Sequence, residues 1–138
     1  MTYALKSDLQ TALGDAELIQ LTDRADPPLG DIDDAVLTRA LEAADGEINS
    51  YLATRYSLPL AATTAVLRDC AIDIARYRLH DRAAPDRVAQ DYKDRIAWLI
   101  LISTGKASLG VADADAPSGV GAPDMTSGGR DWGRDQCF

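Results

Sequence analysis

The feature that most constrains this chain is a pair of apolar stripes joined by a proline-containing corner. In the first stretch, apolar side chains recur every three or four positions, at Leu37, Leu41, Ala44, Ile48 and Leu52. The second stretch repeats this spacing at Val66, Cys70, Ile74 and Tyr77. This spacing places the apolar side chains of each stretch along one face of an α-helix.

The corner between the stripes is Ser57-Leu58-Pro59-Leu60. A proline cannot continue a helix, so we expect the first helix to end near Tyr56, with Tyr56 and Leu58 packing the corner. Thr63 or Thr64 is a suitable cap for the next helix, which should reach about His80. Two amphipathic helices joined in this way bury their stripes against each other as a helical hairpin.

The flanking segments add further helices. Residues 5–21 have the pattern of two short helices broken at Gly14, and a last helix should run from Pro85 to Gly105. We therefore predict an all-α fold, a small bundle of about four to five helices with a long central helical hairpin. Its expected core comprises Leu37, Leu41, Ile48, Leu52, Leu67, Ile74, Tyr92, Ile96 and Leu99.

The last expected helix is apolar on more than one side. Its main stripe comprises Val88, Tyr92, Ile96, Leu99 and Ile100, and Trp98, Leu101 and Ile102 lie off that stripe. A helix that is apolar nearly all round is normally covered on every side. Either the short N-terminal helices cover its second face, or another subunit does.

The composition changes after residue 104. Seven of the ten glycines lie in the last 34 residues, so we divide the chain into a helical domain, 1–104, and a flexible Gly-rich tail, 105–138. Residues 107–111 could form one short extended piece. The tail ends with side chains typical of protein–protein anchors, which suggest a docking segment as the alternative to a ragged terminus: Arg130, Trp132, Arg134 and Phe138.

Charge is unevenly distributed along the chain. The net charge of −8 argues against a broad surface that grips nucleic-acid phosphates. Residues 1–47 contain eleven acids and three bases, whereas residues 48–104 contain six acids and eight bases. The uneven charge fits either a solvated surface with salt bridges between helices or a head-to-tail contact between copies. In the second case, the acids Asp31, Asp33 and Asp34 would meet Arg76, Arg78 or Arg82 of a neighbouring copy.

No group of residues indicates catalysis, a metal site or a cofactor. Cys70 and Cys137 form no disulfide framework, and Asp31-x-Asp33-Asp34 lacks the glycine and glutamate of a calcium loop, so helix capping explains it better. His80 is the only histidine, and no nucleophile motif accompanies it. The chain has no signal-peptide pattern and no apolar run of membrane-spanning length, so we expect a soluble, non-enzymatic protein of a reducing cytoplasm.

Two segments resemble a known family. They are Tyr51-x-x-x-Arg55-Tyr56-x-Leu58-Pro59-Leu60 and Asp73-Ile74-Ala75-Arg76-Tyr77, and the resemblance covers about residues 3–105. The pattern is similar to that of the Mu-type tailed-phage neck proteins, which belong with the small helical head–tail connector, or adaptor, proteins.

The resemblance implies a structural protein of the virion neck that is assembled in the bacterial host cytoplasm. Connectors of this kind form a ring, usually of twelve copies, below the portal protein and extend the DNA channel toward the next neck or tail protein. DNA would pass through without sequence-specific binding. In related connectors a C-terminal segment reaches the portal, which would be the role of the four tail residues. A bacterial helical interaction module, or a regulator with a disordered tail, shares the compositional features and remains the alternative.

Overall fold

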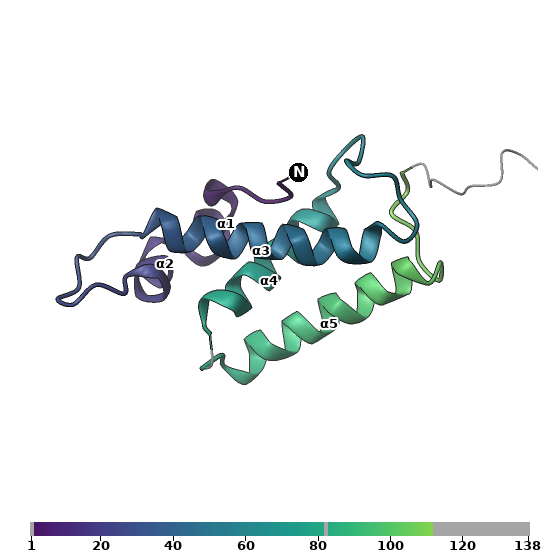
Figure 1. The fold of residues 1–138 in the computed structure, drawn as a ribbon. Helices are drawn as coiled ribbons and strands as arrows, with labels where there is room; N and C mark the ends of the chain where they lie inside the picture. Colours follow the sequence, from purple (N-terminus) through teal and green to yellow (C-terminus); the bar gives the residue numbers. More distant parts are fainter. Residues whose placement is uncertain (1, 82, 112–138) are drawn as a thin grey trace, which may run out of the picture.

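The computed structural model describes residues 2–81 and 83–111, and in this part of the chain every regular element is a helix (Figure 1). The predicted all-α fold class is therefore confirmed. The five helices are α1 (Lys6–Leu13), α2 (Asp15–Thr22), α3 (Asp34–Leu52), α4 (Ala65–Leu79) and α5 (Asp86–Ser103).

The core lies where α3, α4 and α5 pack against one another. Seven of the nine predicted core residues are buried there: Leu37, Leu41, Ile48, Leu52, Leu67, Ile74 and Leu99. The other two, Tyr92 and Ile96, are partly buried and pack against this core. Each fully buried aliphatic side chain stabilises the fold by about 1.5–3 kcal/mol relative to an exposed one, so this cluster dominates stability.

Three apolar positions were assigned to the wrong face. Val66 is 45% exposed and its neighbour Leu67 is buried, while Ile100 is 45% exposed and Ile102 is buried. Leu58 lies at the surface of the corner, whereas Tyr56 and Leu60 are buried. In each case two apolar residues stand close together in the sequence, and only the packing of the neighbouring helix decides which one is covered.

The first helix of the hairpin is shorter than expected. It ends at Leu52, and the backbone N–H groups of Arg55 and Tyr56 both donate to the Leu52 carbonyl, which turns the chain before the proline is reached. Thr64 caps α4, as one of the two expected candidates. The early turn brings the Tyr56 ring into the core.

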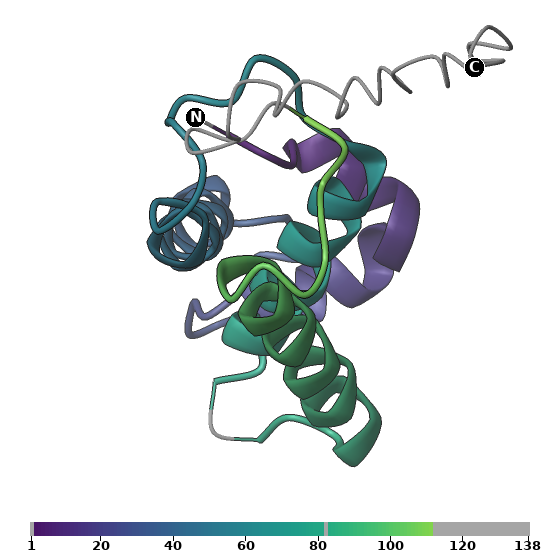
Figure 2. The ribbon, with the colours of Figure 1, turned by 90° about the vertical axis from the view of Figure 1, so that its right-hand side faces the viewer.

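The two short helices lie on the hairpin, with α1 against α4 and α2 against α3. Leu9 and Leu18 are their buried side chains, and the chain breaks between the helices at Gly14, whose φ is 85°. The break at Gly14 is thus confirmed. In Figure 2, α1 and α2 lie on the other side of α4 from α5.

Of the three side chains that lie off the main stripe of α5, Ile102 is buried and Trp98 is partly buried, whereas Leu101 stays exposed. Ile100 and Leu101, which we call the α5 apolar face, are 45% and 43% exposed. Trp98, by contrast, is partly buried against the core.

The residues that follow α5 run along the surface of the domain. Gly105, with a φ of 78°, ends the helix, and the N–H groups of Lys106 and Ala107 donate back to the Leu101 carbonyl. Beyond this turn, Ala107, Leu109 and Val111 alternate toward the core. The Leu109 N–H donates to the Tyr56 hydroxyl at 3.2 Å, so this segment lies beside the corner after α3.

The neighbours Val66 and Leu67 provide a matched test of the helix face. Leu67→Asp should unfold the domain, because an unpaired buried carboxylate costs several kcal/mol against a total stability of roughly 5–15 kcal/mol. Val66→Asp places the same charge on an exposed site in the first turn of α4, where an acid suits the helix dipole. Thermal unfolding followed by circular dichroism should show loss of the transition for the first variant only. Equal midpoints would mean that the face of α4 is assigned wrongly.

Candidate functional site

The acidic residues that the sequence singled out lie at the start of α3. Asp33 caps this helix, because its carboxylate accepts hydrogen bonds from the N–H groups of Ala35 and Val36 at 2.9 and 3.3 Å. Asp34 forms an ion pair with Lys6 of α1. Asp31 is exposed. Of the three, Asp31 is the one whose carboxylate has no hydrogen bond or ion pair to another residue of 2–81 and 83–111.

Two of the predicted basic residues are engaged within the chain. The Arg76 guanidinium binds Glu17 of α2, through Nε at 2.9 Å and Nη2 at 2.6 Å, and both side chains are about a third exposed. Arg78 binds Glu47 of α3 at 2.6 Å. Arg82 lies outside the described residues, as do Arg130, Trp132, Arg134 and Phe138, so their predicted roles stay predictions.

Glu47 connects the three long helices. It accepts from Arg78 of α4, and its other oxygen accepts from the Tyr92 hydroxyl of α5 at 2.7 Å. The Tyr92 ring also stacks on Tyr77 with a centroid distance of 4.2 Å. Burial, and then the hydrogen bond to Glu47, raises the pKa of Tyr92 to about 12, so its hydroxyl stays protonated as a donor.

Other charges act in the same way. Arg95 of α5 binds Asp73 of α4 at 2.6 Å. Together with Lys6–Asp34, Arg76–Glu17 and Arg78–Glu47, this makes four ion pairs that each join two different helices. Salt bridges between helices therefore account for three arginines of the basic middle segment.

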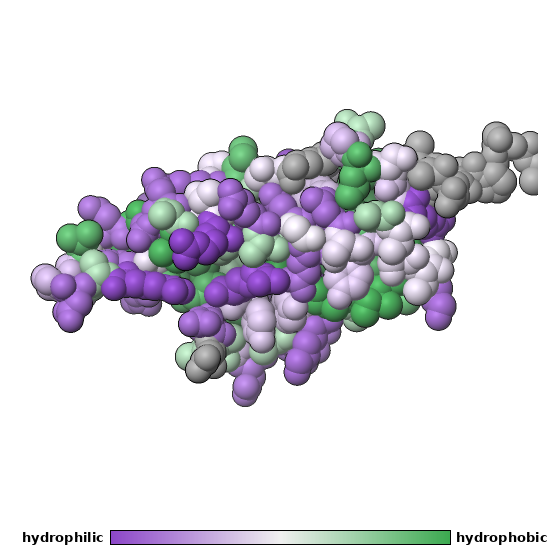
Figure 3. All heavy atoms as spheres, viewed as in Figure 1, coloured by the Kyte–Doolittle hydropathy of each residue, from purple (hydrophilic) through white to green (hydrophobic). Residues whose placement is uncertain are grey.

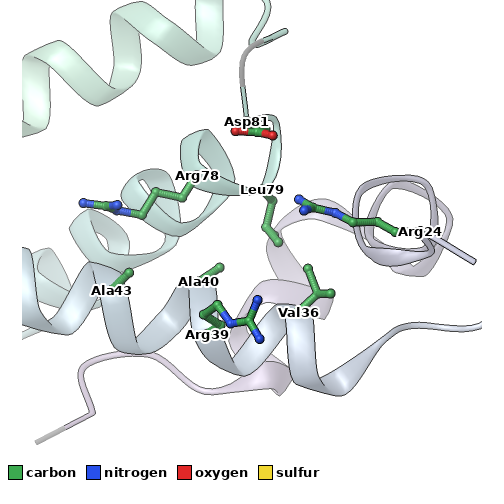
Figure 4. A pocket seen from close by; sticks show the side chains of 8 residues that line it. All are labelled: Arg24, Val36, Arg39, Ala40, Ala43, Arg78, Leu79 and Asp81. Carbon is green, nitrogen blue, oxygen red and sulfur yellow. The ribbon is translucent and has the colours of Figure 1, made fainter.

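Sequence reasoning missed a basic hollow at the surface, which we call the Arg24–Arg39 hollow (Figure 4). It has a volume of about 210 Å³. Its lining comes from the loop after α2, from α3 and from the end of α4: Arg24, Val36, Arg39, Ala40, Ala43, Arg78, Leu79 and Asp81. In Figure 4 the side chains of Arg24 and Arg39 extend toward the floor formed by Val36, Ala40 and Leu79, whereas Arg78 extends away past Ala43. A signal existed, because Arg24 and Arg39 are two of only three bases among residues 1–47.

Apolar surface is concentrated elsewhere. Figure 3 shows apolar atoms over the C-terminal half of α5, where Ile100 and Leu101 form the α5 apolar face. Leu29, in the loop between α2 and α3, is 77% exposed. Both positions are candidate contacts with another protein chain, because large exposed apolar side chains gain most from being covered.

Cys70 lies in the core, and His80 lies at the end of α4. Burial raises the pKa of the Cys70 thiol to about 12, and a thiol rather than a thiolate is a weak nucleophile. His80 caps the end of α4, and its buried Nε2 has no hydrogen-bond partner among the described residues. Within residues 2–81 and 83–111, no three His, Cys, Asp or Glu side chains are grouped to hold a metal ion. None of the five helices is both long and apolar enough to span a membrane.

The N-terminal segment is attached to α3 by a buried carboxylate. The Tyr3 N–H donates to Asp45 Oδ1 at 3.0 Å, and the Tyr3 hydroxyl donates to Asn49 Oδ1 at 2.5 Å. Burial raises the pKa of Asp45 above its ordinary value, although the hydrogen bond from Tyr3 acts in the opposite direction. Asp45 thus loses contact with water on folding, and in return its carboxylate holds the N-terminal segment against α3.

Comparison with known proteins identifies relatives along most of the chain. A family model described as Bacteriophage Mu, Gp36 matches residues 3–127. The Mu-like prophage FluMu protein gp36 of Haemophilus influenzae is 43% identical over 110 residues, which cover 78% of this chain and 77% of that protein. Gene product J of Escherichia phage Mu is 34% identical over 122 residues, which cover 88% of this chain and 85% of that protein.

Asp45→Asn should change the pH dependence of stability. The amide can still accept from the Tyr3 N–H but carries no charge. Because the pKa of Asp45 is higher in the folded than in the unfolded chain, its contribution is fully present below the unfolded pKa and is lost as the pH rises through the folded pKa. The difference between the free energy of unfolding of the variant and that of the wild type should therefore shift in favour of the variant as the pH rises from about 4 toward neutrality.

Urea unfolding at a series of pH values measures this difference. Asp31→Asn, the same chemical change at an exposed site in the loop before α3, is the control. If the Asp45→Asn and wild-type stability curves run parallel across the acid range, the assigned direction of the Asp45 shift is wrong.

Proposed function

The chain belongs to the Bacteriophage Mu, Gp36 family, and from this premise we propose that it is a structural head–tail connector of a phage neck. In this role it assembles as a ring below the portal protein and extends the DNA channel toward the tail. The ring is built in the bacterial host cytoplasm and remains in the virion neck. The role involves no enzymatic step.

The observation that carries the assembly part of this proposal is the α5 apolar face. Ile100 and Leu101 lie on a helix that packs inward with Leu99 and Ile102, so both of its sides are apolar. The N-terminal helices contact α3 and α4 and leave these two side chains exposed. A neighbouring copy in a closed ring would supply the missing cover.

The charge of the chain supports passage of DNA over its binding. The net charge of −8 gives an unfavourable overall interaction with phosphates, and salt-dependent phosphate contacts are what hold DNA on a protein. Three arginines of the basic middle segment are occupied by in-chain carboxylates. A lumen of such subunits would let DNA slide.

The predicted contact between Asp31, Asp33 and Asp34 of one copy and Arg76, Arg78 or Arg82 of the next belongs to the same proposal. Arg76 and Arg78 would have to exchange their partners Glu17 and Glu47 to make it. Exposed ion pairs contribute only about 0–1 kcal/mol each, so such an exchange gains little. Other surfaces must therefore contribute to the ring.

Interrupting the coding sequence in its phage tests the role directly. We expect DNA-filled heads and finished tails to accumulate unjoined, because a connector is needed only where the two meet. Electron microscopy of the lysate, together with measurement of late transcripts, separates the two function classes. A loss of late transcripts and of both heads and tails would indicate the alternative, a regulator, and joined infectious particles would exclude the connector role.

The predicted docking of the tail has its own test. A version that ends at Val111 keeps the residues that pack on the domain and removes Arg130, Trp132, Arg134 and Phe138. Mixed with portal particles at equal concentration, full-length protein should form complete rings and the shortened version should form few. Equal decoration in the images would remove the docking role from the tail and leave the connector role in place.

A further inference from the structure

The loop between α2 and α3 presents an apolar side chain on a base held by hydrogen bonds; we call residues 25–32 the Leu29 loop. The Asp23 carboxylate accepts from the N–H groups of Gly30 at 2.7 Å and Ala25 at 3.3 Å. The base is closed by the Asp33 N–H, which donates to the Thr22 hydroxyl at 3.1 Å. Leu29 is the most exposed of the large apolar side chains in the described part, and the loop projects from one end of the molecule (Figure 1).

The same loop carries two carboxylates that form no ion pair with another described residue. Asp26 and Asp31 are exposed on either side of Leu29. Neither carboxylate forms an ion pair with another residue of 2–81 and 83–111. The loop therefore offers one apolar side chain between two negative charges, in a conformation that is already ordered.

The Arg24–Arg39 hollow has the complementary properties. Its floor is apolar, with Ala40 and Leu79 nearly buried and Val36 partly so. Three arginines and one aspartate line it, which gives 3 − 1 = +2 charges. Arg78 is neutralised by Glu47, but Arg24 and Arg39 have no ion-pair partner within the part of the chain that the structure describes.

We propose that the Leu29 loop of one copy of this chain occupies the Arg24–Arg39 hollow of another copy. Leu29 lies on the floor of Val36, Ala40 and Leu79, while Asp26 and Asp31 approach Arg24 and Arg39. The inference rests on the proposed ring, for which it supplies a subunit contact made by arginines that the chain leaves unpaired.

The size and chemistry of the hollow favour a peptide side chain over other ligands. Its volume of about 210 Å³ is below the roughly 300–1,000 Å³ of small-molecule and cofactor sites. A nucleic-acid backbone would bring charge but no apolar group for the floor, and the net charge of −8 would repel it. An acidic loop with a leucine brings an apolar side chain for the floor and carboxylates for the arginines.

The order of the loop also favours this contact. Binding by a disordered segment loses conformational entropy, whereas a loop already closed by Asp23 and Thr22 loses less. Complementary charges on the two surfaces raise the rate of encounter and select the register. One chain carries both halves of the contact, so identical copies can propagate it.

Disulfide trapping between full-length copies tests the contact even when association is weak. The natural cysteines are replaced by Cys70→Ala and Cys137→Ser; one preparation then carries Leu29→Cys and the other Val36→Cys. Under mild oxidation of the mixture, the 29–36 disulfide should form at least about tenfold faster than a control disulfide, a factor that corresponds to 1.4 kcal/mol. The control pairs Leu29→Cys with Ser50→Cys, an exposed site fourteen residues further along α3 and so about 21 Å away.

Charge reversal identifies the groups responsible. Arg24→Glu with Arg39→Glu in the Val36→Cys copy should slow trapping about tenfold, and Asp31→Arg in the Leu29→Cys copy should restore part of the rate. Arg68→Glu, an equal change of charge on α4 eleven residues before Leu79, should have no effect. The proposal would be overturned if the 29–36 disulfide formed no faster than the control disulfide, or if its rate did not change with the charge reversals in the hollow.

A nucleic-acid role for the hollow is measured with the same variants. If the full-length protein binds a short DNA duplex and only the Arg24→Glu, Arg39→Glu variant loses this binding, while trapping is unchanged, the hollow serves DNA and the loop contact is wrong. The neck role is judged separately by the interrupted phage. If the interrupted phage accumulates unjoined heads and tails but no disulfide is trapped, the loop contact is wrong and the neck role stands. If the disulfide is trapped but the interrupted phage still produces joined particles, the neck role is wrong and the loop contact stands.

Discussion

The structure depends on one requirement, which is that the apolar stripe of α3 must be covered from two sides. Leu37, Ile48 and Leu52 lie along nearly the whole length of that helix and are all buried. A single partner helix covers only part of such a stripe, and α3 packs against both α4 and α5. The positions of the other elements follow, because the corner after Leu52 must return α4 to this stripe and the connection at Asp81 must return α5.

Charged side chains then fix the register of one helix against another, which the apolar core alone leaves adjustable. Four ion pairs each join a different pair of helices, and the Glu47 carboxylate holds α4 and α5 to α3 through two oxygens. Each exposed pair contributes little to stability, but a bonded pair excludes neighbouring registers of one helix against another. The arginines used in this way are no longer available to a partner. That division leaves Arg24 and Arg39 as the basic groups with unsatisfied charge near an apolar floor.

Much of this fold could be predicted from periodicity, and the remainder depends on contacts between distant residues. The hairpin, the break at Gly14 and the Thr64 cap are local features with local causes, and all three are present. The choice between Val66 and Leu67, by contrast, depends on how far α4 is rotated about its axis, which neighbouring helices set. Arg76 and Glu17 are 59 residues apart, so no local pattern links them. The Arg24–Arg39 hollow draws its lining from three segments, and its one signal in the sequence is the scarcity of bases before residue 48.

The segment after α5, residues 105–111, lies beside the corner that follows α3. Its backbone is bonded to Tyr56, beside the corner that follows α3, whereas the Leu29 loop leaves from the opposite end of the same helix (Figure 1). The two are separated by a helix of 19 residues, or about 28 Å. A force that pulls residues 105–111 away from a partner bound to the Leu29 loop would therefore act along the axis of α3. The helix then carries tension along its axis, and its buried stripe resists slippage of the hairpin.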